Sequence, residues 1–426
     1  MAETDAKIQD NAYFYGLRTE DITWDFRYED TKTFTHGIHS YPAMMIPQVA
    51  RRLIDNYSSE GDVVLDPFCG SGSVLVEARI AKRYSWGIDL NPLATLVAHV
   101  KTTLINPKVL HDDFVNILYQ ISKMDGTQVS QPDFFNLHFW FKDNIINELA
   151  RLKAAILALE RKESRQFFLV TFSEIVRLVS NSRIGEFKLF RYSKEKLEKH
   201  NPEPLKLFIS KALNNIEGMK DFYDACSKNY WCRIIDADST IPIAEIPAES
   251  VDMVITSPPY GDSRTTVAYG QFSRLSLQWL GLAEDRARGL DDELLGGKPY
   301  RFEDTTLNSP TLDVTLDYIA KQDFRRAQQI KAFYIDLGRS LKTMGHYLKH
   351  NSHACIVIGN RRVKGMQLQT DVIICEIARD LGFNPEEIIV RNIPNKTMPL
   401  RNSPTNVKGL LEDTMHKEYI VILQKI

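Results

Sequence analysis

Two short segments of this chain combine residue types whose spacing could do chemistry, and the first is a glycine-containing turn. Its sequence is Asp66-Pro67-Phe68-Cys69-Gly70-Ser71-Gly72, between the apolar run Val63-Val64-Leu65 and an apolar stretch that begins at Val74. Gly70 and Gly72 lack Cβ atoms, so the backbone can bend tightly and a ligand can approach it. The third glycine of a dinucleotide-binding fingerprint is missing, which argues against NAD. We therefore predict a ligand-binding turn, with an ordinary tight turn as the alternative.

The second segment, Thr256-Ser257-Pro258-Pro259-Tyr260, directly follows the expected strand Val251-Asp252-Met253-Val254-Ile255. Neither proline can donate an N–H, so the strand cannot continue its ladder and a helix cannot start there. This arrangement suits an exocyclic amine, whose two protons Ser257 Oγ and the Pro258 carbonyl could accept while Tyr260 stacks on the ring. A double proline that only punctuates a loop is the alternative interpretation.

Carboxylates follow two further apolar runs. Trp86-Gly87-Ile88 ends at Asp89, and Arg233-Ile234-Ile235 ends at Asp236 and, two residues later, Asp238. An acidic residue after the second strand of such a fold can accept hydrogen bonds from both hydroxyls of a ribose. A surface aspartate that caps the following helix is the alternative for Asp89. Together with the glycine turn, the pattern favours a nucleoside-containing cofactor.

The elements that must position these residues predict an α/β fold. Further strands are expected in the apolar runs at 354–360, 387–391 and 418–423, with a helix at 368–381. We predict one catalytic domain formed by 1–108 and 231–426 and interrupted by a helical insertion at 109–230. In that insertion the apolar residues recur on one helical face. The segment 261–312 is rich in Gly, Asp, Arg and Thr and is predicted to be an irregular loop near the target pocket.

These residues resemble the DNA amino-methyltransferases that use S-adenosylmethionine, and within them the cytosine-N4 group with its Ser-Pro-Pro-Tyr motif. The resemblance implies a Rossmann-like methyltransferase sheet and direct methyl transfer to the N4 amine of a flipped cytosine. It implies that the motif Ser257, Pro258, Pro259 and Tyr260 is catalytic. The cofactor contacts that it implies are Tyr41, Asp66, Pro67, Phe68, Gly70, Ser71, Gly72, Asp89, Asn91 and Asp238.

The resemblance also implies partners and leaves questions open. Double-stranded DNA is the expected substrate, and a companion restriction endonuclease is the expected setting. The helical insertion departs from better-known layouts because it falls before the third strand. The insertion, expected to recognise the target, therefore competes for that role with a Pro-rich stretch that contains Asn392, Asn395, Lys396, Arg401 and Asn402.

Composition is that of a globular enzyme with local positive charge. The 426 residues carry a net charge of −2, so a nucleic-acid footprint must be local. Basic residues gather at 177–211 and 325–364 and predict phosphate contacts, with solvated helix faces as the alternative. No apolar run could span a bilayer and the first residues are polar, so we expect a cytoplasmic location without membrane contact.

Cysteine usage bears on mechanism. The 5 cysteines form neither a close metal-ligand pair nor a disulfide framework, and no metal site is expected. Cys69 is interpreted as a small packing residue, and amine methylation needs no cysteine nucleophile. Adenine-N6 methylation of DNA and guanine-N2 methylation of RNA remain alternatives, the latter because Gly261 follows Tyr260. A non-catalytic nucleic-acid-binding protein with this fold is a further alternative.

Overall fold

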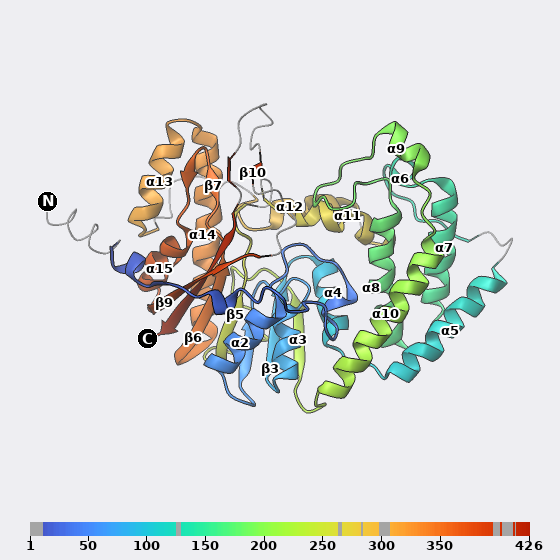
Figure 1. The fold of residues 1–426 in the computed structure, drawn as a ribbon, viewed down its shortest axis with the longest axis horizontal. Coiled ribbons are helices and arrows are strands. Elements are labelled where there is room, and N and C mark those ends of the chain that lie inside the picture. Colours follow the sequence, from blue (N-terminus) through green and yellow to red (C-terminus); the bar gives the residue numbers. More distant parts are fainter. Residues whose placement is uncertain are drawn as a thin grey trace.

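A central sheet of eight strands organises the protein in this computed structural model (Figure 1). The structure describes residues 12–124, 129–262, 266–282, 286–297, 307–394 and 415–426, and the backbone alone at 284–285, 401–402 and 412–413. The strand order is β1 (Arg18–Glu20), β9 (Phe383–Asn392), β12 (Lys417–Lys425), β6 (Leu348–Ile358), β5 (Val251–Thr256), β2 (Val63–Asp66), β3 (Tyr84–Asp89), β4 (Cys232–Asp236). Among the described pairings of this sheet, those of β12 are antiparallel and the others are parallel.

The direction of the strand order reverses beside β2. From β2 the chain adds β3 and β4 on one side, then returns to place β5 and β6 on the other. In such sheets ligands bind outside the carboxyl ends of the strands, at the point where the order reverses. The glycine turn follows β2 and the Ser-Pro-Pro-Tyr motif follows its neighbour β5, so the topology brings both motifs to that point. The prediction of a Rossmann-like α/β fold is confirmed.

Helices cover both faces of the sheet, and alternate residues of each strand explain why. Val64 of β2 packs with α2 (Pro47–Tyr57) and α3 (Ser73–Ile80), whereas its neighbour Leu65 packs with α14 (Phe324–Tyr347) and α15 (Thr370–Asp380). Successive side chains of a strand point to opposite faces, so a strand covered on both faces reads as a continuous apolar run. That is the pattern of 63–65 in the sequence.

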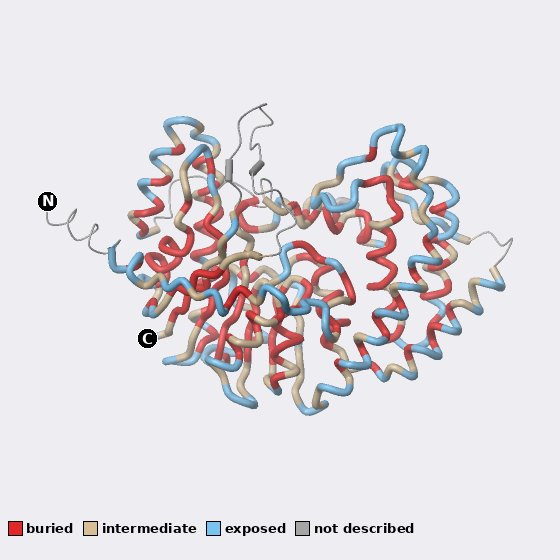
Figure 2. Tube along the Cα trace, viewed as in Figure 1, coloured by how far each residue is buried: buried red, intermediate tan, exposed pale blue. Residues whose placement is uncertain are grey.

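The segment between β3 and β4 is helical and forms a separate lobe beside the sheet (Figure 1). After α4 (Pro92–Thr102), the chain forms α5 (Pro107–Lys123), α6 (Leu137–Trp140), α7 (Asp143–Leu157), α8 (Lys162–Val179), α9 (Lys194–Lys199) and α10 (Pro204–Ala225). Their apolar faces share a core that includes Leu149, Phe168 and Phe208. In Figure 2 the buried parts of these helices line the inside of the lobe.

The expectation of an irregular stretch over 261–312 is wrong for most of its described residues. This stretch contains α11 (Tyr269–Leu280), α12 (Glu284–Glu293) and the start of α13 (Pro310–Ala320). In α11, Phe272, Leu275 and Trp279 are buried at helical spacing, and Trp279 packs against rings of the helical lobe. The Gly and Arg residues between them hide this spacing in the sequence.

The remaining described elements are short. They are the helical turns η1 (Ile22–Trp24) and η2 (His36–Ile38), and the strand pairs β7 (Arg362–Val363) with β8 (Met366–Gln367) and β10 (Arg401–Asn402) with β11 (Glu412–Asp413). Within the described residues, no helix combines the length and the apolar character that crossing a membrane requires. The same residues contain no cluster of three metal-ligating side chains.

Candidate cofactor and target-amine site

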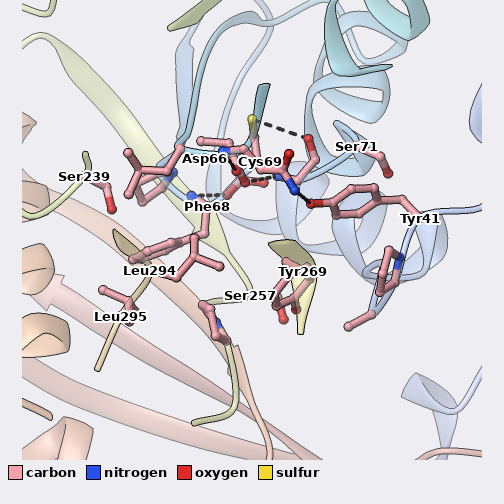
Figure 3. Close-up of a pocket in the computed structure, with 18 of the residues that line it drawn as sticks. Tyr41, Asp66, Phe68, Cys69, Ser71, Ser239, Ser257, Tyr269, Leu294 and Leu295 are labelled. Carbon is pink, nitrogen blue, oxygen red and sulfur yellow. Dashed lines mark hydrogen bonds between the residues drawn. The ribbon is translucent and has the colours of Figure 1, made fainter. Parts of the chain in front are cut away.

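A cavity of about 390 Å³ lies at the carboxyl ends of β2, β3, β4 and β5 (Figure 3). That volume is typical of a pocket for a small organic ligand. Most of the predicted site residues line it, namely Tyr41, Asp66, Pro67, Phe68, Gly70, Ser71, Asp89, Asn91, Asp238, Ser257 and Pro259. Three predicted residues do not line it, namely Gly72, Pro258 and Tyr260.

The glycine turn is tied to the strands on either side of β2. Asp66 accepts a hydrogen bond from Thr256 Oγ1 at 2.7 Å, at the end of β5, and another from the Phe68 N–H at 3.1 Å. On the other side, the Gly70 N–H donates to Asp89 Oδ2 at 2.9 Å, at the end of β3. These bonds fix the backbone of the turn before any ligand binds.

Gly72 has a structural use instead of the predicted cofactor contact. It precedes α3 with φ +85°, a left-handed conformation that favours glycine. A Cβ built there would lie 3.0 Å from the Cβ of Ala98 on α4. Gly72 therefore lets α3 start in close contact with α4, and it faces this helix instead of the cavity.

Replacing Gly72 by alanine is expected to lower the free energy of unfolding by about 2–4 kcal/mol. Left-handed backbone costs a non-glycine residue about 1–2 kcal/mol, and overpacking against Ala98 adds about 1–2 kcal/mol. Thermal or urea unfolding measures the change. Gly61→Ala is the matched control, because Gly61 has φ +91° and its built Cβ has no neighbour within 4 Å among the described residues. Equal losses in the two variants would contradict the role of the Ala98 contact.

Both carboxylate oxygens of Asp89 accept hydrogen bonds from the backbone and keep capacity to accept others. Oδ2 accepts from the Gly70 N–H, and Oδ1 accepts from the Asn91 N–H at 2.8 Å. Each oxygen retains one lone pair, which matches the two hydroxyls of a ribose. Burial raises the pKa of Asp89 to about 6, and burial raises the pKa of Asp66 to about 7.

Cofactor affinity is expected to fall as the pH is lowered through about 6. Because the pKa of Asp89 is raised to about 6, its carboxyl takes up a proton below that pH and loses acceptor capacity. The loss approaches roughly tenfold per pH unit. Calorimetric titration across this range measures it. Asp89→Asn is expected to bind the cofactor weakly, with an affinity that depends less on pH. Asp66→Asn shows how much of the pH dependence comes from Asp66. A wild-type affinity that is constant across the range would contradict the expectation.

One end of the cavity is apolar and suits a purine ring. Phe68, Leu294 and Leu295 gather there with Ser239 (Figure 3). Asp238, the neighbour of Ser239 in sequence, lines the cavity and accepts from the Thr240 N–H at 2.8 Å, whereas Asp236 forms an ion pair with Arg286 and does not line the cavity. Sequence reasoning missed the two leucines, because they follow α12 in the stretch that was expected to be irregular.

The other end of the cavity is built from aromatic and amide side chains. Tyr41 stacks on Tyr269 with ring centroids 6.0 Å apart, and its hydroxyl accepts from Asn91 Nδ2 at 2.8 Å. Asn91 also caps α4 through the Leu93 N–H at 3.0 Å and donates to Ser273 Oγ at 2.7 Å. Asn91 thus joins Tyr41, α4 and α11. Tyr269 was not among the predicted site residues, although it lies nine residues after the motif tyrosine.

The helical lobe holds the segment that carries Tyr41. Lys211 Nζ on α10 donates to the Gly37 carbonyl at 3.0 Å, and Asn215 Nδ2 donates to the Ile38 carbonyl at 3.1 Å. On α8, Glu174 accepts from the Ser40 N–H at 3.3 Å and pairs with Lys211 at 2.8 Å. The lobe therefore supports one wall of the cavity, whatever else it contacts.

A buried lysine stands behind the glycine turn. Lys101 of α4 is fully buried, and its ammonium nitrogen lies 3.3 Å from Ser71 Oγ. Burial lowers the pKa of Lys101 to about 7. The sequence signal for a buried lysine was available, because Lys101 lies on the apolar face of a helix, but sequence reasoning missed it.

The Ser-Pro-Pro-Tyr motif lies beside the middle of the cavity. Ser257 faces it, and Ser257 Oγ donates to the Tyr260 hydroxyl at 3.3 Å. Tyr260 in turn donates to Glu418 Oε1 on β12 at 2.9 Å. A Cβ at Gly359 would lie 2.7 Å from the Tyr260 ring, so this ring packs against the sheet. Its role in stacking on a base stays a prediction.

Several predicted DNA-contact residues have other partners or lie outside the described part. Asn392 donates from its backbone and its side chain to Asp25 at 2.7 and 3.1 Å. Asn395 and Lys396 lie outside the described residues, as do the side chains of Arg401 and Asn402.

The two basic stretches are not uniformly available for phosphate contact. Arg177 packs over the Phe272 ring at 4.3 Å, and Arg326 and Arg361 both pair with the buried Asp262 at 2.9 and 3.1 Å. Their prediction as phosphate contacts is corrected, because these side chains are satisfied inside the protein.

Comparison with known proteins identifies the family. A family model described as DNA methylase matches residues 12–98. The chain is 39% identical to the type II methyltransferase M.MvaI of Kocuria varians over 98% of its own length and 95% of that protein. The chain belongs to the DNA amino-methyltransferases. Its methyl donor is S-adenosylmethionine, and it is of the type found in restriction–modification systems.

Two further similarities are weaker or shorter. The type II methyltransferase M.BsoBI of Geobacillus stearothermophilus is 21% identical over 84% of this chain and 83% of its own. A tRNA (guanine(10)-N2)-dimethyltransferase of Methanocaldococcus jannaschii is 40% identical over only 12% of this chain and 15% of its own. The second match is confined to 52 residues, so it does not extend the family assignment to RNA.

The cavity fits S-adenosylmethionine by charge as well as by volume. The cofactor carries a sulfonium cation, and Asp66 and Asp89 bring carboxylates to the cavity wall. The cofactor supplies an activated methyl group when it is bound. The protein residues described above would hold and orient it, and Ser257 lines the same cavity.

Proposed function

We propose that the enzyme transfers a methyl group to the exocyclic N4 amine of cytosine in double-stranded DNA. The observation that carries the proposal is the position of Ser257, which faces the cofactor cavity from the end of β5. In the enzyme families that this chain resembles, serine before the two prolines is associated with cytosine-N4 enzymes, whereas Asp or Asn at that position is associated with adenine-N6 enzymes.

The hydrogen bonding of Ser257 supports an amine as the target. Its hydroxyl proton is directed to Tyr260, so its lone pairs are available to an incoming N–H. The amine lone pair of cytosine is delocalised into the ring. Acceptors for the amine protons favour a more tetrahedral nitrogen, whose lone pair can attack the methyl carbon.

Because this amine is paired inside a duplex, the cytosine must leave the base stack before reaction. Exposed basic side chains for contacting the duplex remain on the helical lobe near α9. They are Arg183, Arg191, Lys194, Lys196 and Lys199. We infer that this surface contacts phosphates, and that a companion endonuclease acts on the same recognition sequence.

Transfer of labelled methyl groups to mixed duplex DNA and RNA, followed by nucleoside analysis, tests the proposal. N4-methylcytosine in DNA is the expected product. N6-methyladenine would retain the site and contradict the assignment of the base. Label confined to N2-methylguanine in RNA would contradict the substrate class.

A further inference from the structure

A chain of hydrogen bonds runs from the cavity wall to a carboxylate on a distant strand. Ser257 Oγ lies 3.3 Å from the Tyr260 hydroxyl, and this hydroxyl lies 2.9 Å from Glu418 Oε1. Glu418 is 158 residues away from Tyr260 in sequence. The sheet brings it there because β12 lies next to β6, which is the neighbour of β5.

The carboxylate of Glu418 is held in place from its other side. Its second oxygen accepts from Arg391 Nη1, and the two residues are directly opposite each other on β12 and β9. Arg391 is itself anchored through Nε to the Trp24 carbonyl at 2.8 Å. The side chain of Arg391 is 4% exposed and that of Glu418 is 17% exposed, so only the carboxylate of this pair has appreciable contact with water.

The ion pair between Glu418 and Arg391 sets the direction of both hydrogen bonds that link Ser257 to Glu418. An ionised carboxylate can only accept, so Tyr260 must donate its single proton to Glu418. The Tyr260 oxygen is then left as the acceptor for the Ser257 hydroxyl proton. Ser257 Oγ consequently has its proton engaged, which leaves its lone pairs as the groups it can offer to the cavity.

We propose that Glu418 is a positioning residue for methyl transfer: acting through Tyr260, it directs the lone pairs of Ser257 toward the target amine and receives the proton that the amine releases. The inference rests on the proposed function in that it assumes an exocyclic amine at Ser257. It does not depend on which base carries that amine.

The proton balance of the step is complete. The amine nitrogen forms a bond to the methyl carbon, the carbon–sulfur bond breaks, and its electron pair stays on sulfur as a neutral thioether. The nitrogen, now positive, releases one proton to Ser257 Oγ. At the same time the Ser257 proton moves to the Tyr260 oxygen and the Tyr260 proton moves to Glu418. Glu418 becomes a neutral acid, and its exposed edge lets it return the proton to water.

Glu418→Gln tests the proposal, because an amide keeps the shape of the side chain but cannot take up the proton. We expect the single-turnover rate of methyl transfer to fall roughly 100-fold, as for loss of a proton acceptor. Affinities for S-adenosylmethionine and DNA are expected to stay within about twofold. Tyr260→Phe removes the hydroxyl that links Ser257 to Glu418 and leaves the ion pair between Glu418 and Arg391 in place. We expect a similar loss of rate in this variant. It also provides the test if Glu418→Gln folds poorly.

Lys417→Gln is the matched control. Lys417 is adjacent to Glu418 on β12 and pairs with Glu20 at 2.5 Å. This variant therefore removes a neighbouring ion pair that is separate from the hydrogen bonds between Ser257, Tyr260 and Glu418. Its rate is expected to match the wild type.

A pH profile separates proton transfer from a merely structural effect. At saturating cofactor, the wild-type rate is expected to fall at acidic pH, and this fall should be absent in Glu418→Gln. Arg391 and Tyr260 are the charged and titratable partners of Glu418 within the described residues, and both are unchanged in this variant. Saturating cofactor limits the influence of Asp66 and Asp89. Wild-type rates and an unchanged profile in both Glu418→Gln and Tyr260→Phe would overturn the proposal.

A second measurement needs neither cofactor nor DNA. Burial, and then the charge of Glu418, raise the pKa of Tyr260 well above its usual value. Tyrosine labelled with carbon-13 at Cζ, with the Tyr260 signal assigned from Tyr260→Phe, should show a lower pKa for this phenol in Glu418→Gln. An unchanged signal would contradict the contact. If the wild-type product is N6-methyladenine, the cytosine assignment is wrong. The same variants then test proton transfer to Glu418 with adenine as the target base.

Discussion

Replacing Ser257 by alanine is expected to slow methyl transfer by roughly 100- to 1,000-fold while leaving cofactor affinity nearly unchanged. Removal of one well-placed hydrogen-bonding group from a reacting centre typically costs this much in rate. Ser257 forms part of the cavity wall, but the carboxylates that accept hydrogen bonds from the backbone of the cofactor turn are those of Asp66 and Asp89. The chemical step should therefore change while the binding step does not.

Single-turnover kinetics and equilibrium binding of S-adenosylmethionine measure the two effects of Ser257→Ala separately. Ser250→Ala is a matched control, because Ser250 precedes β5 at the end opposite to Ser257 and its hydroxyl donates to the Pro247 carbonyl at 2.7 Å. Equal losses in rate and in cofactor affinity for Ser257→Ala would undermine its assignment to the target amine.

Replacing Asp89 by alanine is expected to weaken cofactor binding by roughly 100- to 10,000-fold. Each hydrogen bond to an ionised carboxylate contributes about 1.5–3 kcal/mol, and two such bonds to a ribose would be lost. The variant also leaves the N–H groups of Gly70 and Asn91 without their acceptor, which loosens the turn. The rate at saturating cofactor should change much less than the affinity.

Asp236→Ala is the control for Asp89→Ala. Asp236 pairs in register with Asp89 on the neighbouring strand, yet its carboxylate contacts Arg286 outside the cavity. Calorimetry on both variants compares two carboxylates at equivalent strand ends. An affinity for S-adenosylmethionine in Asp89→Ala equal to that of Asp236→Ala would remove Asp89 from the site.

Local patterns in the sequence were sufficient to predict the strands that build the site. A strand buried on both faces must be apolar throughout, so 63–65 and 253–255 stand out without knowledge of their partners. Each motif directly follows such a strand, which places its residues at one edge of the sheet. The motif residues that line the cavity could be predicted for this reason.

Features that depend on packing between distant segments could not be predicted in the same way. Gly72 looks like a ligand-binding glycine until Ala98 of α4 is placed against it. Leu294 and Leu295 reach the cavity only because α11 packs on the helical lobe and returns the chain over the site. The contact between Tyr260 and Glu418 depends on the position of β12 in the sheet, which no local pattern reveals.

The hydrogen bonds from α8 and α10 to residues 37–40 limit how such enzymes can exchange parts. A lobe that only read DNA could be transplanted between relatives as a cassette, with a new recognition sequence as the sole consequence. Here a transplanted lobe would also have to supply the counterparts of Glu174, Lys211 and Asn215, or the wall that carries Tyr41 would lose its support. Recombination within the lobe is therefore constrained by the cofactor as well as by the DNA.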